Sequence, residues 1–242
     1  HGRREPAFLI ARNAESDFGF TRSGEASVAL RQQFGRFGLT LSAEQGDAVS
    51  SGVSRIAGIK RQRGNLSRFG LSADRRFGAV ETALTASWLS EDRTVLGARM
   101  HDAFGARGAD SLFLDANAAW AFAPGWQLGG AWRQGFTHAR AGGLVAGGSR
   151  LASKAWSLDL ARGDVFAQGD SLAFRVSQPL RVQSGGLNLD LPVAYSYDTL
   201  AATRGITAVN LSPRGREITG EIAWRGPLWR GAAAASVFYR RN

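Results

Sequence analysis

The residue types that most often carry acid–base or metal chemistry are scarce in this chain. Its 242 residues include three histidines, at positions 1, 101 and 138, and no cysteine. None of these histidines has the spacing of a metal-binding pair, and without cysteine there is no thiolate ligand and no disulfide. His101-Asp102, with Ser111 nearby, has the residue types of a catalytic triad, but an exposed loop histidine is the simpler interpretation. We therefore predict no catalytic residue, no metal and no cofactor, and the chain has no phosphate-binding glycine loop.

Arginines and carboxylates are the other residues with chemical potential, and their placement indicates ion pairing. The chain has 30 Lys+Arg against 20 Asp+Glu, for a net charge of +10. We predict that Arg133, Arg175 and Asp190 face a hydrated interior. There Arg133, Arg175 or Arg216 would pair with carboxylates of neighbouring strands, namely Asp115, Asp159, Asp190, Glu217 and Glu221. Dispersed arginines without a recognition motif do not indicate a nucleic-acid partner, and nothing in the spacing selects two carboxylates as a hydrolase pair.

Strands must position these residues, because apolar and polar residues alternate along most of the chain. The alternation is clearest in residues 187–197, and it recurs in residues 112–122 with Asp115 on the polar face. Thirty-one glycines fit a sheet with many turns. Roughly twelve or thirteen strands are expected. Expected strands include residues 17–22, 25–34, 36–45, 126–137, 172–182, 187–197, 216–224 and 229–240. Turns are expected at 23–24 and 183–186, and loops at 46–64 and 141–148.

The expected strands are long enough to cross a membrane. About ten residues per strand match the length of transmembrane strands, whereas strands of soluble proteins average about five or six residues. Aromatic residues near strand ends predict an interfacial girdle, composed of Trp88, Trp120, Trp126, Trp224 and Trp229. These features predict an all-β fold, an antiparallel up-and-down transmembrane β-barrel of about twelve strands in the bacterial outer membrane. In that barrel Leu189 would face lipid. A soluble β domain that buries its apolar faces in protein is the alternative.

Several sequence blocks carry a resemblance to a known family. They are Phe174-Arg175-Val176-Ser177-Gln178-Pro179-Leu180-Arg181-Val182, Leu191-Pro192-Val193-Ala194-Tyr195, Leu211-Ser212-Pro213-Arg214-Gly215-Arg216-Glu217, Ala223-Trp224-Arg225-Gly226-Pro227-Leu228-Trp229, Leu96-Gly97-Ala98-Arg99 and Ser111-Leu112-Phe113-Leu114-Asp115-Ala116. Together they resemble the C-terminal autotransporter-like β-domain of subtilisin-type serine peptidases from α-proteobacteria. The resemblance covers residues 65–240. No catalytic motif of that family occurs in this chain, so no catalytic residue is carried over.

The resemblance implies a division of labour. Residues 1–16 would be a linker from an upstream passenger, and residues 17–242 the barrel that anchors it and exports or displays it. The implied partners are outer-membrane lipid, the chain's own passenger (a subtilisin-like peptidase) and the barrel-assembly machinery. The chain ends in Arg240-Arg241-Asn242 rather than an aromatic, so we expect either a missing last strand or an unconventional barrel. The rival interpretations are a soluble accessory domain of a secreted peptidase and a passenger-free porin-like protein.

Overall fold

Strands are the only regular secondary structure in the described part of the chain, where turns and loops connect them. The computed structural model describes residues 8, 10–11, 13–15, 21–49, 64–99, 105, 107–229 and 231–241. None of these residues belongs to a helix that is long and apolar enough to cross a membrane. The expected all-β class is confirmed.

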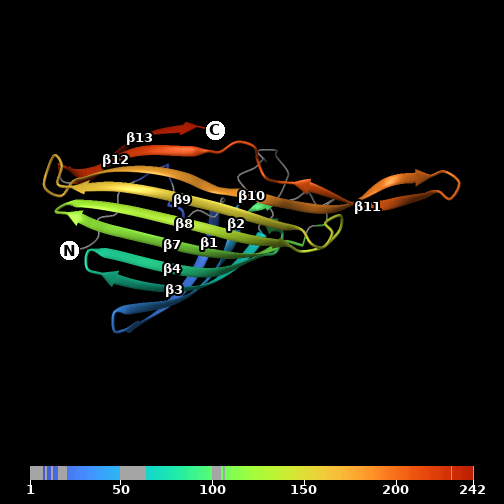
Figure 1. Ribbon diagram of the computed structural model, residues 1–242, viewed down its shortest axis with the longest axis horizontal. Helices are drawn as coiled ribbons and strands as arrows, with labels where there is room; N and C mark the ends of the chain where they lie inside the picture. The colour runs from blue at the N-terminus through green and yellow to red at the C-terminus, as the bar shows by residue number, and fades with distance from the viewer. Residues whose placement is uncertain are drawn as a thin grey trace.

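Consecutive strands pair with one another to form one curved antiparallel sheet (Figure 1). Along the sheet they are β1 (Thr21–Phe34), β2 (Phe37–Val49), β3 (Gly64–Phe77), β4 (Val80–Glu91), β7 (Ala109–Ala123), β8 (Trp126–Ala139), β9 (Arg150–Gly163), β10 (Ser171–Ser196), β12 (Ile218–Leu228) and β13 (Gly231–Arg241). β11 (Ala201–Asn210) pairs with the far half of β10 as an eleventh strand, and β5 (Thr94–Val95) pairs with β6 (Ala98–Arg99) as a separate small hairpin. This is the predicted up-and-down order.

The sheet is open, which differs from the closed barrel that the sequence predicts. Within the described residues, β1 pairs only with β2 and β13 pairs only with β12. Neighbours along the sheet alternate in direction, so β1 and β13 run antiparallel to each other. Direct pairing of the two edges is therefore compatible with the topology.

The two ends of the sheet differ in the length of their connections. At one end, here the turn end, short turns join the strands, and Gly35, Gly78 and Gly125 adopt the positive φ that such turns require. At the opposite end, here the loop end, lie residues 92–99, 105, 107–108 and 140–149. The β10–β11 hairpin projects beyond this end, at the right of Figure 1. Short turns at one end and long loops at the other are typical of outer-membrane barrels.

Three expected strand boundaries are wrong. The predicted turn at 23–24 lies inside β1, β2 continues to Val49 past the loop start predicted at Gly46, and the turn at 183–186 lies inside β10. Residues 50–63 of that predicted loop lie outside the described part of the chain. The register instead shifts between Ser23 and Ala26 in β1, and at two places in residues 178–184 of β10. Glycine-rich stretches here mark strand irregularities rather than turns, because a bulge can absorb an extra residue without ending the strand.

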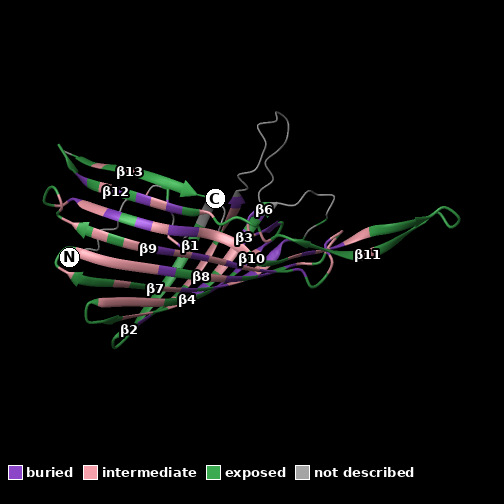
Figure 2. Cartoon of the chain, turned by 45° about the horizontal axis from the view of Figure 1, so that its top comes forward, coloured by how far each residue is buried: buried purple, intermediate pink, exposed green. Residues whose placement is uncertain are grey.

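The two faces of the sheet have opposite chemistry. The outer face carries large apolar side chains that are exposed, among them Val28, Leu30, Leu41, Phe69, Leu71, Leu84, Leu114, Trp120, Trp132, Phe136, Leu158, Phe174, Ile222 and Val237. The inner face carries polar side chains that are buried, namely Ser87, Glu91, Ser111, Asp115, Arg133, Thr137, Ser153, Ser157, Arg175, Ser177, Thr219 and Glu221. Figure 2 shows the buried positions along the central strands, whereas β13 is largely exposed.

Candidate functional site: the polar inner face

Two arginine–aspartate pairs form the centre of the inner face. The guanidinium of Arg133 on β8 donates two hydrogen bonds to Asp115 on β7, of 2.6 and 2.9 Å. Arg175 on β10 makes the same two-pronged contact with Asp159 on β9, at 2.6 and 2.6 Å. In both pairs the partners stand directly opposite each other in the register. A buried arginine is tolerated only when its charge and donors are satisfied, and these contacts provide that.

Further ion pairs continue across β1 to β3. Arg68 on β3 donates to its cross-strand partner Glu44, with a shortest distance of 3.2 Å. Arg31 on β1 reaches over β2 to Asp74 on β3, with hydrogen bonds of 2.6 and 2.7 Å. Gly38 lies beneath this contact, and a Cβ there would meet both partners. The absence of a side chain at position 38 thus lets the pair span two strand spacings.

A segment from before the first strand lies on the inner face. Glu221 on β12 accepts hydrogen bonds from the backbone N–H groups of Ile10 and Ala11, at 3.0 and 2.5 Å. Arg175 donates to the carbonyl oxygen of Ala11 at 3.0 Å, and its guanidinium lies 4.1 Å from the centre of the Phe8 ring. Farther along the segment, the contacts pass from β12 and β10 to β9 and β8.

On these two strands the contacts again involve mainly backbone groups of the segment. Ser157 on β9 accepts from the N–H of Ala14 at 3.5 Å, and Arg133 donates to the carbonyl oxygen of Glu15. Side chains that recognise N–H and C=O groups carry little sequence preference, because every residue except proline offers both. The inner face can therefore hold a peptide segment of varied sequence.

An apolar layer lies on the inner side at the loop end. Leu187 and Leu189 of β10 pack there with Val145 from the 140–149 loop and Val95 of β5. Leu96, between β5 and β6, contacts both this cluster and a second one, composed of Ala48, Leu66, Leu89 and Phe113. The prediction that Leu189 faces lipid is wrong, because this side chain is only 8% exposed and is covered by protein.

Glu91 anchors the small hairpin to this layer. The carboxylate is fully buried, and it accepts hydrogen bonds from the N–H groups of Leu96 and Gly97, at 2.9 and 2.8 Å, and from the Thr94 hydroxyl at 2.6 Å. Leu96 and Gly97 both have positive φ, as the tight turn requires. The hairpin is thus fixed in the fold and covers part of the inner face.

The predicted interior residues do not all lie together. Arg133 and Arg175 lie on the inner face, as described above. Asp190 does not join them: it lies on the β10–β11 hairpin, is half exposed and pairs with Arg204 at 3.0 Å. Leu187 and Leu189 face the inner side on this part of β10, so the intervening side chains, including Asp190, face outward. Glu217, expected to pair with Arg133, Arg175 or Arg216, contacts Arg240 at 3.0 Å instead.

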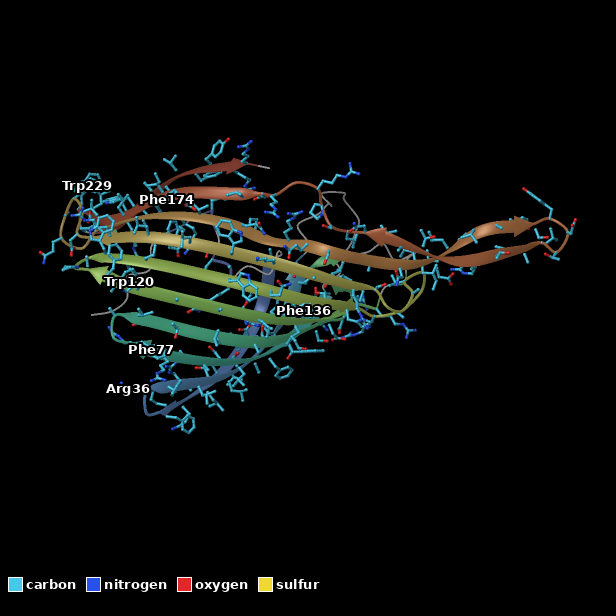
Figure 3. The ribbon with its side chains drawn as sticks, viewed as in Figure 1. Arg36, Phe77, Trp120, Phe136, Phe174 and Trp229 are labelled. Carbon is cyan, nitrogen blue, oxygen red and sulfur yellow. The ribbon has the colours of Figure 1, made fainter. Side chains whose placement is uncertain are left out.

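The predicted girdle tryptophans divide between the two ends of the sheet. Trp120, Trp126, Trp224 and Trp229 lie at the turn end, and Trp229 in the last turn is 95% exposed. Trp88 lies at the loop end, near the end of β4. Figure 3 shows Trp120 and Trp229 with Phe77 and Phe174 toward one end of the molecule and Phe136 toward the other. Exposed aromatics thus lie near both ends of the sheet.

Sequence reasoning missed the contacts of residues 8, 10–11 and 13–15 with the inner face and the ion pairs of Arg31 and Arg68. The described residues contain no group of three or more histidines and carboxylates able to hold a metal ion. His101 and Asp102 lie outside them.

Comparison with known proteins does not assign this chain to a family. No protein-family model matches the chain, and no curated protein matches it. Among solved structures it is similar to an outer membrane protein of Vibrio cholerae described as OmpT (in-vitro folded), with 11% sequence identity and a TM-score of 0.49. That alignment covers 89% of this chain, which spans 55% of the other.

Proposed function

We propose that this chain is an outer-membrane β-barrel domain that holds its own upstream segment on its inner face and exports or displays a passenger. The observation that carries the proposal is the inverted polarity of the sheet. Charged side chains such as Arg133 are fully buried, while large apolar side chains such as Leu84, 64% exposed, face outward. In water, burying ion pairs and exposing leucines along the same strands are both unfavourable. In a membrane barrel, by contrast, the outward side chains contact lipid and are apolar, while the inward side chains are polar.

A lipid environment requires the open edges to pair. Unpaired backbone groups in hydrocarbon cost several kcal/mol each, so a membrane-spanning sheet closes on itself. β1 and β13 run antiparallel and have 14 and 11 residues, which supports direct pairing. The functional form we propose is therefore a barrel of the ten strands from β1 to β13, with the β10–β11 hairpin projecting from its loop end.

The inner-face contacts support the role of a translocator. Arg133, Ser157, Arg175 and Glu221 bind main-chain groups of residues 10–15, which is the recognition expected for a segment that passes through a barrel. The passenger class we propose is the subtilisin-type peptidase that the sequence resemblance implies, and the assembly partner is the barrel-assembly machinery. The polar interior would also suit a passenger-free porin. The seated segment and the apolar layer at the loop end favour a barrel occupied by its own chain.

Display of the upstream segment is the direct test. An epitope placed before residue 1, in a chain produced in the outer membrane of a Gram-negative host, should be accessible to antibody on intact cells. The variant Glu221→Ala, which removes the acceptor for the Ile10 and Ala11 N–H groups and leaves the Arg175–Asp159 pair intact, should lower this display while the folded barrel persists. A folded barrel whose epitope is reached only after the outer membrane is opened would contradict export. Recovery of the chain in the soluble fraction would favour the accessory-domain alternative.

Seating of the segment can be measured separately, because the chain has no cysteine. Ala14 is buried, so a single Ala14→Cys variant should react slowly with a bulky, membrane-impermeant maleimide. The Thr199→Cys control, at the exposed tip of the β10–β11 hairpin, should react fast. Equal rates at the two positions would contradict a seated segment.

A further inference from the structure

A cluster of positively charged residues lies on the outer face near the loop end. Arg150 and Lys154 lie on β9 with side chains on the same face, and Arg181 lies opposite Lys154 on β10. His138 of β8 lies opposite Arg150. His138 also lies opposite Asp110 on β7, but Arg150, Lys154 and Arg181, unlike the inner arginines, contact no carboxylate within the described part of the chain. Arg181 donates to the carbonyl oxygen of Pro213 at 2.5 Å, and its Nε has no hydrogen-bond partner there.

The arrangement is unfavourable without a ligand. Two like charges directly opposite each other on neighbouring strands repel, as Lys154 and Arg181 do. Placing an anion between them removes this repulsion and satisfies donors that the protein leaves free. An anionic ligand bound here would therefore stabilise the cluster.

An apolar groove lies beside the cluster. Its volume is about 450 Å³, and its lining includes the apolar side chains of Trp88, Leu112, Phe136 and Ala152 together with Arg150 and His138. Asp110 also lines it, but both oxygens of that carboxylate are bound by Arg140, at 2.5 and 2.8 Å. The groove thus combines apolar side chains with the positive charge of Arg150 and with Lys154 and Arg181 close by, which is the complement of an anionic amphiphile.

The position of the cluster on the strands agrees with this ligand. On β9 the outward apolar residues Trp156, Leu158 and Leu160 lie on the turn-end side, and Lys154 and Arg150 follow toward the loop end. The positive charges therefore lie at the border of the outer apolar surface, where the headgroups of a bilayer would be. We infer that this groove binds a lipid with a phosphate-bearing headgroup, with an acyl chain against Phe136 and Trp88 and the phosphate between Arg150, Lys154 and Arg181. The inference rests on the proposed membrane location.

Lipid binding to the refolded chain tests this assignment. The probe is diphosphoryl lipid A in detergent micelles, compared with the same lipid after removal of its phosphates. Because the chain has seven tryptophans, occupancy of the groove is reported by the part of the fluorescence change that a Trp88→Phe variant loses. Loss of two charges in Arg150→Gln/Lys154→Gln should weaken binding of the phosphorylated lipid roughly 25-fold, at about fivefold per cation. The matched control Arg162→Gln, on the outer face of the same strand at the turn end, should bind as the unaltered chain does.

Three results would overturn the assignment. They are equal affinity for the dephosphorylated lipid, unchanged binding by the double variant, and full competition by inorganic phosphate, which would indicate a free-anion site. If the double variant does not fold, Lys154→Gln alone should still weaken binding about fivefold. A chain that folds into a heat-modifiable barrel without phosphate selectivity refutes only this inference. A chain that does not form such a barrel refutes the proposed function.

Discussion

The inner and outer faces of the same strands differ sharply in the polarity and burial of their side chains. On β8, Arg133 is fully buried and paired with Asp115, while its strand neighbour Trp132 faces outward and is exposed. On β10, Arg175 pairs with Asp159 while Phe174 is exposed on the outer face. One residue along the strand separates buried charge from exposed apolar surface. The strands are thus adapted to a polar interior and an apolar exterior.

The largest effect should come from breaking an inner pair. Arg133→Leu leaves the Asp115 carboxylate buried without its partner, so we expect a loss of about 3–5 kcal/mol in the free energy of unfolding. Arg162→Leu is the matched change on the outer face, where the exposed side chain only stacks over the Trp126 ring at 5.0 Å, and it should change stability by no more than about 1 kcal/mol. Urea unfolding in detergent micelles, followed by tryptophan fluorescence, measures both. Similar losses in the two variants would remove the distinction between the faces.

A charge on the outer face comes next. Leu84→Arg, in the middle of β4, should destabilise the inserted barrel by about 2–4 kcal/mol if the side chain faces the centre of the membrane. Leu200→Arg makes the same change at the exposed tip of the β10–β11 hairpin and should have little effect. Folding yield in lipid vesicles compares the two. In a soluble domain both substitutions would be nearly neutral, since both positions are exposed.

Leu189 sharpens the comparison, because its apolar side chain lies on the inner side. Leu189→Ala should cost about 2–3 kcal/mol, the lower part of the range for buried leucines, since the 140–149 loop can relax into the space. Protease sensitivity of that loop should rise in parallel. The Leu200→Ala variant serves as the exposed control. A stable loop in the Leu189 variant would mean that the cluster with Val145 contributes little.

The smallest effect concerns pH at the turn end. Burial raises the pKa of Asp170, but hydrogen bonds from the Trp224 indole and from the N–H groups of Val165, Phe166 and Ala167 outweigh it, and the pKa lies below its ordinary value. A lowered pKa means that the stabilisation is complete above the unfolded value of about 3.9 and is lost as pH falls through the folded value. Asp170→Asn should lower the temperature at which the folded band disappears at neutral pH. The difference from the unaltered chain should shrink in acid, and a constant difference would contradict the assignment.

Part of this arrangement follows from sequence alone. Strand alternation and the turn at Pro124-Gly125 place Asp115 and Arg133 on one face of neighbouring strands, so their pairing could be predicted. The position of Leu189 could not, because two register shifts in β10 decide how its strand continues past the expected turn. The contacts of Ala11 with Arg175 and Glu221 join residues more than 160 positions apart, and no local pattern encodes them.

The most direct test of the account is a gel-shift assay on the chain refolded in detergent, comparing boiled and unboiled samples. Closure of β1 on β13 around the polar inner face predicts that the unboiled sample migrates faster and resists protease. A chain that folds in plain buffer, shows no shift on boiling and stays soluble without detergent would contradict the membrane barrel.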